Sequence, residues 1–276
     1  QEHHAQQFLY QALSGRGYEM DQWAIDLAEI REHPGFSPVK VDYENAVNVV
    51  ATHHPINSIG RSLILNGHID VVPTGPEAMW TKPPFEPTVN GDWLYGRGGA
   101  DMKAGLVANL FALDALRTIG MQPAARVCLQ SVTEEECTGN GALSCLVRGY
   151  RADAVLIPEP EENMLVRANV GVIWFRLHVR GKPIHVREAG AGANAIEATF
   201  DLFHALKQLE KEWNVQRKNH RYFGRLDHPI KINRSKIEGG NWASTVPSWC
   251  TPVLRVSIYP GVDPRHAAKV IEDCIA

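Results

Sequence analysis

A histidine and an aspartate follow a short apolar run in the first third of the chain. Leu63–Leu65 has the pattern of a strand covered on both faces, and His68 and Asp70 come soon after it. In open α/β sheets, ligands bind at the ends of strands. A carboxylate close to a histidine can fix the tautomer that binds a metal ion. The pair therefore indicates a metal ligand with a supporting carboxylate, although the same spacing also occurs in ordinary polar turns.

Acidic residues also lie where other predicted elements begin or end. Asp101 comes between a glycine-rich stretch and a predicted helix, where it could also serve as an N-cap. Glu134–Glu136 follows the predicted strand 127–132, and Glu159 follows the apolar stretch 154–158, which is predicted to be a short buried strand. Three adjacent carboxylates repel one another, so a solvated loop is the alternative to a cation site. One imidazole with several carboxylates suits Zn²⁺, Co²⁺ or Mn²⁺ better than a metal that prefers thiolates.

The elements that would position these residues alternate along the first half of the chain. This order predicts an α/β fold with a helix-flanked, mostly parallel sheet. The segment 21–31 fits a strand or a helix. The predicted strands cover residues 47–52, 63–67, 127–132 and 154–158, and the predicted helices cover residues 8–15, 102–119 and 140–149.

The second half of the chain has a different order of predicted elements. The predicted order is strand 172–179, helix 194–213, strands 230–237 and 251–258, and a helix over 265–275. This is the order of an α+β ferredoxin-like unit without its last strand. We therefore expect a metal-binding catalytic domain over residues 1–170 and a second domain over residues 171–276.

Composition narrows the possible functions. The 276 residues are 44% hydrophobic and 21% charged, which is ordinary for a globular protein. A net charge of −3 gives no basic surface for nucleic acid and no polybasic membrane patch. No apolar run approaches the roughly 18–20 residues that a membrane span needs. Five cysteines without a Cys-x-x-Cys pair indicate reduced thiols and a cytoplasmic location.

Taken in this order, the motifs resemble those of the M20 metallopeptidase/deacylase family, over nearly the whole chain. The family includes acetylornithine deacetylases and succinyl-diaminopimelate desuccinylases, and within it the chain looks nearest to acetylornithine deacetylases and related N-acyl amino acid deacylases. The matching segments are Gly67–Pro73, Gly96–Gly98, Asp101–Lys103, Glu134–Glu136, Glu159-Pro160, Pro183–Val186 and Gly192–Ile196.

The resemblance implies a centre for two metal ions. His68 and Glu159 would bind the first ion, Glu136 would bind the second, and Asp101 would bridge the two. The expected ions are Zn²⁺, with Co²⁺ as a possible substitute.

The resemblance also implies the catalytic roles. Glu135 would be the general base that takes a proton from the attacking water, and Asp70 would orient His68. Three glutamates in a row leave the register open by one residue. If it slips, Glu134 becomes the base and Glu135 the ligand.

Three residues of the second domain follow from the same resemblance. His185 would polarise the substrate carbonyl, often in the active site of a partner subunit, so a homodimer through this lid domain is expected. Asn194 and Arg255 are candidate substrate contacts. A surface-loop histidine and an exposed strand arginine are the alternatives for His185 and Arg255.

The chain departs from the family pattern in one respect. Family members carry a further histidine ligand near their C-terminus, and we find no counterpart. His266 begins the last predicted helix and is expected to be a surface residue. We therefore expect a C-terminally incomplete chain that binds one ion at most when metal is limiting and carries most, but not all, of an active site.

The leading hypothesis is a metal-dependent hydrolase that cleaves the amide bond of an N-acyl amino acid, in the manner of an acetylornithine deacetylase. A carboxypeptidase or dipeptidase acting on short peptides is the alternative with the same chemistry. A metal-binding protein without catalysis is the alternative from another class.

Overall fold

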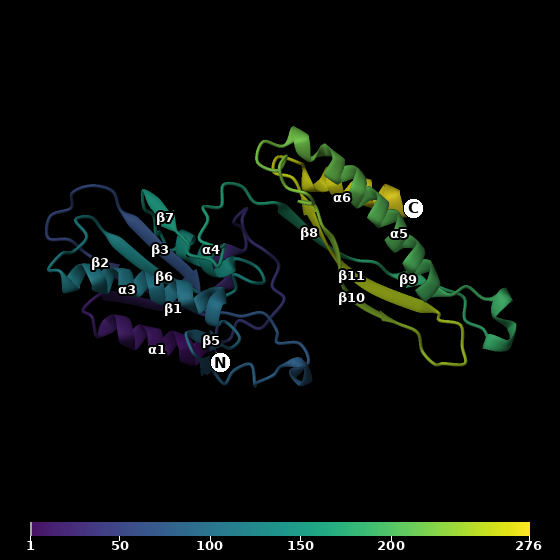
Figure 1. The fold of residues 1–276 in the computed structure, drawn as a ribbon, viewed down its shortest axis with the longest axis horizontal. Helices are drawn as coiled ribbons and strands as arrows, with labels where there is room; N and C mark the ends of the chain where they lie inside the picture. The colour runs from purple at the N-terminus through teal and green to yellow at the C-terminus, as the bar shows by residue number, and fades with distance from the viewer. Residues whose placement is uncertain (1) are drawn as a thin grey trace. The chain divides into compact units, whose positions relative to one another are not determined.

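The chain folds into two compact units, Gln1–Met164 and Leu165–Ala276. The computed structural model describes residues 2–276, and Gln1 lies outside the described part. Each unit contains one main sheet with helices packed on it (Figure 1).

The first unit is built on a five-stranded mixed sheet. β3 lies inside the sheet and runs parallel to both of its neighbours, β6 and β7, whereas β1 pairs antiparallel with β2 and β2 antiparallel with β6. Parallel pairs need a crossover, and helices supply it here between β3 and β6 and between β6 and β7. The expected α/β class is confirmed. The order is β1 (Glu19–Ala24), β2 (Val47–His53), β6 (Val127–Val132), β3 (Leu63–His68) and β7 (Ala154–Leu156).

Helices cover both faces of this sheet. α1 (Glu2–Ser14) and α3 (Gly105–Thr118) bury leucines in one cluster with Val49 and Leu129. α4 (Asn140–Val147) covers the other face, where Val50 and Cys145 pack together. Neighbouring residues of β2 thus face opposite sides, as the pleat of a strand requires.

The structure decides one open prediction for this unit and corrects another. The segment 21–31, which fitted a strand or a helix, contains both, the end of β1 and the short helix α2 (Leu27–Ile30). The prediction of a buried strand at 154–158 is wrong, because β7 pairs only with β3 and leaves Val155 56% exposed at the sheet edge.

The residues before α3 are also irregular. The expected helix start at residue 102 is replaced by a π-helical turn, Gly99–Ala104, in which Asp101 and Met102 have non-helical dihedral angles. Before this turn lie the 3₁₀ turn Glu77–Met79 and a small hairpin of β4 (Thr88–Asn90) and β5 (Trp93–Tyr95). Asp101 therefore lies in a turn ahead of α3.

The second unit is an antiparallel sheet with two helices, as expected for the α+β part. The sheet order is β10-β11-β8, and a short strand β9 also pairs with β11. Leu206, Leu254 and Ile271 join both helices to the sheet in one buried cluster. The elements are β8 (Gly171–Arg176), β9 (Val179–Arg180), α5 (Ala195–Val215), β10 (Ile232–Gly239), β11 (Trp249–Ile258) and α6 (Pro264–Ile275), with 3₁₀ turns at Val186–Ala191 and Gln216–Asn219.

Two further features bear on the sequence predictions. Among residues 2–276, none of the helices combines the length and the apolar character that crossing a membrane requires. All five cysteines carry free thiols, and Cys128, Cys145 and Cys250 are buried.

Candidate metal centre

His68 is the buried anchor of the site. It is the last residue of β3 and only 1% exposed. Its Nδ1 lies 3.0 Å from the backbone oxygen of Asp70, and its Nε2 lies 3.0 Å from Asp101 Oδ1. Gly67 allows the strand end to approach α3, since a Cβ there would lie 2.8 Å from the Leu106 side chain. The imidazole is thereby fixed with Nε2 facing the carboxylates.

Two groups of side chains around His68 could hold a divalent ion. One combines His68 with Glu135 and Glu159, and the other combines His68 with Asp101 and Glu136. Within each group, the potential ligand atoms lie within 4.8 Å of one another. The structure thus brings together the imidazole and the four carboxylates expected from the sequence.

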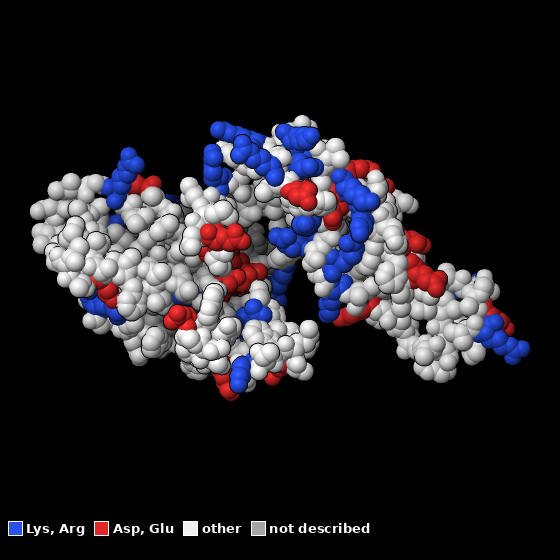
Figure 2. Space-filling view, in the orientation of Figure 1, with Lys and Arg blue, Asp and Glu red and all other residues white. Residues whose placement is uncertain are grey.

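The carboxylates face solvent on one side of the cluster. The side chains of Asp101 and Glu135 are 53% and 51% exposed, whereas that of Glu159 is 28% exposed. Figure 2 shows acidic side chains exposed together on the first unit. A buried imidazole with half-exposed carboxylates leaves a substrate access to any bound ion.

Asp70 does more than orient His68. Its carboxylate is 4% exposed and accepts hydrogen bonds from the backbone N–H of Glu135 at 3.3 Å and of Glu136 at 3.1 Å. Its Oδ1 also lies 3.4 Å from His68 Nδ1. One side chain therefore connects the end of β3 to the loop after β6, a second role that the spacing of His68 and Asp70 does not reveal.

Glu134 lies outside both ligand groups. It is 7% exposed, has a φ of 68°, and accepts a hydrogen bond from the Tyr43 hydroxyl at 3.0 Å. The next two glutamates belong to the ligand groups, which favours the register with Glu135 and Glu136 in the site.

Crowding shifts the protonation of the cluster. Burial by itself lowers the pKa of His68, but the hydrogen bonds and charges of Asp70 and Asp101 outweigh it and raise the pKa to about 9. Burial, reinforced by the neighbouring carboxylates, raises the pKa of Glu159 to about 7. Burial also raises the pKa of Glu135 and that of Glu136. Without a cation these carboxylates hold their protons more tightly, as expected of side chains that bind a divalent ion in their deprotonated form.

Lys103 is a cation beside this cluster that the sequence prediction did not single out as functional. Its Nζ donates to the backbone oxygen of Ile69, between His68 and Asp70, at 2.9 Å. Burial lowers the pKa of this amine, and the charges of Asp70 and Asp101 oppose the shift. Its position two residues after Asp101 could have identified it from the sequence. Tyr43, the other residue that the sequence prediction missed, lies in an irregular segment without a recognisable pattern.

The donor set fits a hard or borderline divalent ion. One imidazole nitrogen and several carboxylate oxygens lie within 4.8 Å of one another in each group, and a cation would offset the burial and the repulsion that raise the pKa values of the carboxylates. The described residues therefore fit the expected cofactor class, whereas they do not select Zn²⁺ over Co²⁺.

The candidate residues of the second unit have local roles of their own. His185 precedes the 3₁₀ turn Val186–Ala191 and is exposed, and its Nδ1 accepts from the Arg187 N–H at 3.2 Å. Asn194 caps α5, its Oδ1 accepting from the Ile196 N–H at 3.0 Å, and borders a cavity of about 600 Å³. Arg255 lies on β11 opposite Trp174 of β8. His266, on α6, is exposed as expected.

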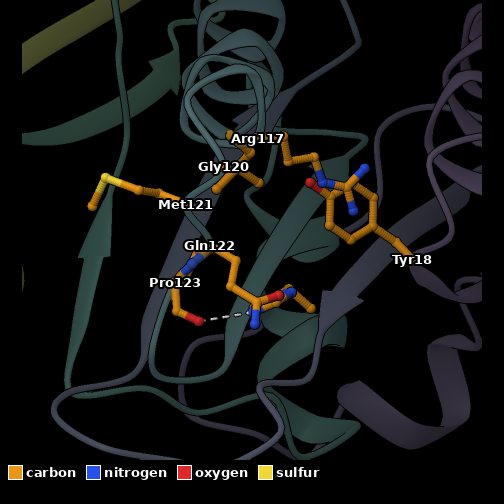
Figure 3. Close-up of a pocket in the computed structure, with 8 residues that line it drawn as sticks. Tyr18, Arg117, Gly120, Met121, Gln122 and Pro123 are labelled. Atoms are coloured by element: carbon orange, nitrogen blue, oxygen red, sulfur yellow. Dashed lines mark hydrogen bonds between the residues drawn. The ribbon is translucent and has the colours of Figure 1, made fainter.

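A separate cavity of about 220 Å³ lies at the opposite end of β6 from the acidic loop (Figure 3). The guanidinium of Arg117 lies 4.7 Å over the Tyr18 ring, and His53 Nε2 lies 2.9 Å from the Pro123 oxygen. Its lining residues contain no carboxylate or thiol. This cavity therefore lacks the carboxylate ligands that surround His68.

Comparisons with known proteins identify the family to which this chain is similar. The model of peptidase family M20/M25/M40 matches residues 64–241. N-formyl-4-amino-5-aminomethyl-2-methylpyrimidine deformylase of Halalkalibacterium halodurans is 32% identical over 280 residues, covering 98% of this chain and 61% of that protein. A probable succinyl-diaminopimelate desuccinylase of Staphylococcus aureus (strain MRSA252) is 34% identical over 171 residues, 61% of this chain and 41% of that protein.

The fold has solved counterparts as well. The M20 family metallo-carboxypeptidase Sso-CP2 from Sulfolobus solfataricus superposes with a TM-score of 0.69 at 17% identity, covering 98% of this chain and 69% of that one. This chain thus spans about three fifths of the length of the deformylase that it matches.

Proposed function

The chain belongs to peptidase family M20/M25/M40, and we propose that it carries the metal centre of a hydrolase that cleaves the amide bond of a small N-acyl compound. The observation that carries this proposal is the pair of ligand groups that share His68. The two groups share one imidazole nitrogen, which binds one ion at a time, so a second ion would need a carboxylate that serves both ions.

We assign the ligands as the family resemblance implies. His68 and Glu159 would hold the first ion, Glu136 would hold the second, and Asp101 would serve both, with Zn²⁺ the expected ion and Co²⁺ a possible substitute. A bound ion polarises the substrate carbonyl and lowers the pKa of water at the site. Asp70 holds the imidazole and the two backbone amides that orient these ligands.

Glu135 is the proposed general base. Its carboxylate takes one proton from the attacking water as the oxygen bonds to the carbonyl carbon, and then passes that proton to the nitrogen of the leaving amine as the C–N bond breaks. The pKa of Glu135 is raised, first by its burial, which suits a group that takes a proton from water and returns it to the leaving amine. His185 would donate to the carbonyl oxygen, and Asn194 and Arg255 would contact the rest of the substrate.

The acyl group is the open part of the proposal. The two relatives are named for the removal of a formyl group and of a succinyl group. Deformylation and desuccinylation are therefore candidate activities, together with the acetylornithine deacetylase-like activity expected from the sequence. The metallo-carboxypeptidase of similar fold favours a peptidase as the second candidate. We also propose a homodimer through the second unit and a cytoplasmic location.

The test is a substrate panel with a catalytic variant. The chain is loaded with Zn²⁺ or Co²⁺ and assayed on N-formyl aminopyrimidine, N-acetylornithine, N-succinyl-diaminopimelate and dipeptides. Glu135→Gln should keep its metal content and lose about 10²- to 10⁴-fold in turnover on whichever substrate reacts. Turnover at the wild-type level in that variant would remove Glu135 from its role. Full metal content with no hydrolysis of any of the four classes would instead support a metal-binding protein without catalysis.

A further inference from the structure

The loop of three glutamates is held from two sides by buried side chains. On one side, the Asp70 carboxylate accepts from the backbone N–H groups of Glu135 and Glu136. On the other side, Glu134 points away from His68 into a buried polar group formed with Tyr43, Thr138 and Asn140. The loop is therefore fixed by its first glutamate as well as by the backbone of the other two.

Two hydrogen bonds of this buried group have a defined direction. Asn140 Nδ2 donates to the Tyr43 hydroxyl at 3.0 Å, and that hydroxyl donates to Glu134 Oε2 at 3.0 Å. Thr138 Oγ1 lies 3.3 Å from the same carboxylate oxygen. Asn140 is fully buried and Tyr43 is 9% exposed, so water cannot readily replace a lost partner.

The backbone shows why the loop needs this support. Glu134 has a φ of 68°, a left-handed conformation that is unfavourable for a non-glycine residue. Its carbonyl accepts from the Thr138 and Gly139 N–H groups at 3.0 and 2.7 Å, which closes the turn. The reversal at Glu134 sends its side chain towards Tyr43 and leaves the following two residues beside His68.

We propose that Tyr43 is a positioning residue for the metal centre: by holding Glu134 in the buried group, it determines that Glu135 and Glu136 enter the site. This inference rests on the proposed function and adds a residue from a distant, irregular segment of the chain. A tyrosine that only fills the core would contribute stability without affecting metal binding, and the experiment separates these two roles.

The experiment compares Tyr43→Phe with a matched control. Tyr150→Phe removes a tyrosine hydroxyl that donates to a carboxylate, Asp21 Oδ2 at 2.7 Å, in the same unit but outside the site. Zn²⁺ affinity is measured by competition with a chelator, and the coordination by the visible spectrum of the Co²⁺ form. Hydrogen exchange of residues 133–141 is followed in the metal-free protein.

Tyr43→Phe should weaken Zn²⁺ binding by about 10- to 100-fold, the usual effect of losing a partner of metal ligands. It should also change the Co²⁺ spectrum and speed exchange in residues 133–141 by at least about tenfold. Tyr150→Phe should remain within about twofold of wild type in all three. Wild-type metal affinity and exchange in Tyr43→Phe, or an equal loss in Tyr150→Phe, would overturn the proposal.

A second variant and the activity assay separate the possible outcomes. Should Tyr43→Phe not fold, Thr138→Val removes the other hydroxyl near Glu134 and should shift metal affinity in the same direction by a smaller factor. A chain that binds metal and hydrolyses nothing would contradict the proposed function while the comparison of Tyr43→Phe still stands. Normal metal binding in both variants of an active enzyme would contradict the role of Tyr43 alone.

Discussion

Metal binding to the His68 cluster should release protons, in a number that depends on pH. In the metal-free protein, His68 has a pKa of about 9 and Glu159 a pKa of about 7. Both must lose their protons to act as ligands. At pH 7, His68 is almost fully protonated and Glu159 is half protonated, so one ion that uses both should displace about 1.5 protons. The number should rise to about 1.9 at pH 6 and fall to about 1.0 at pH 8.

Since each displaced proton opposes metal binding, the apparent affinity should rise with pH. Summed over the two groups, the expected gain between pH 6 and pH 8 is about 10³-fold. The assay is isothermal titration with Zn²⁺ in buffers of different ionisation enthalpy, which gives the number of protons directly. Glu159→Gln should lower the release at pH 7 to about one proton, whereas the exposed, Glu19-paired His54→Gln should leave it unchanged. Binding without proton release, or with no dependence on pH, would refute the assignment of His68 and Glu159 as ligands of the same ion.

Two further predictions concern the supports of the site and of the fold. Asp70→Asn replaces one of the two oxygens that accept from the Glu135 and Glu136 N–H groups by a donor, so the affinity for Zn²⁺ should fall by about 10- to 100-fold. The control is Asp153→Asn, at an exposed carboxylate. Equal affinities in the two variants would contradict the role of Asp70. Leu206→Ala empties a fully buried position in the second unit and should lower its free energy of unfolding by about 2–5 kcal/mol in urea titrations, against about 0.5 kcal/mol or less for Val215→Ala, which is 72% exposed on the same helix.

Hydrophobic periodicity predicted the strand that ends at His68 because the residues of that strand are buried. The apolar run before His68 became β3, an interior strand with a parallel neighbour on each side. The alternating residues of β11 bury one face against the two helices of the second unit. The same approach failed at residues 154–158, because an apolar run looks alike whether the sheet covers it or leaves it at an edge.

The supports of the site could not be found in this way. Tyr43 and Glu134 are 91 residues apart and meet through side chains in irregular segments, where neither helical nor strand periodicity applies. The Asp70 carboxylate was expected beside His68, but its bonds to the N–H groups of Glu135 and Glu136 depend on the turn at Glu134. The spacing of residues along the sequence can identify candidate ligands. Which of these side chains enter the site depends on contacts between distant segments.

The proton on His68 offsets part of the negative charge of this crowded cluster before any ion binds. A charged imidazole beside Asp70 and Asp101 supplies the cation that the carboxylates lack, and the raised pKa of His68 measures that attraction. Lys103 adds a second positive charge whose position is fixed by the Ile69 oxygen. A divalent ion would then replace a proton at His68 Nε2 while the surrounding hydrogen bonds, including those of Asp70, stay in place. The geometry of the site is therefore set mainly by the protein, so variants of Asp70 and Tyr43 should weaken metal binding even though neither side chain is itself a ligand.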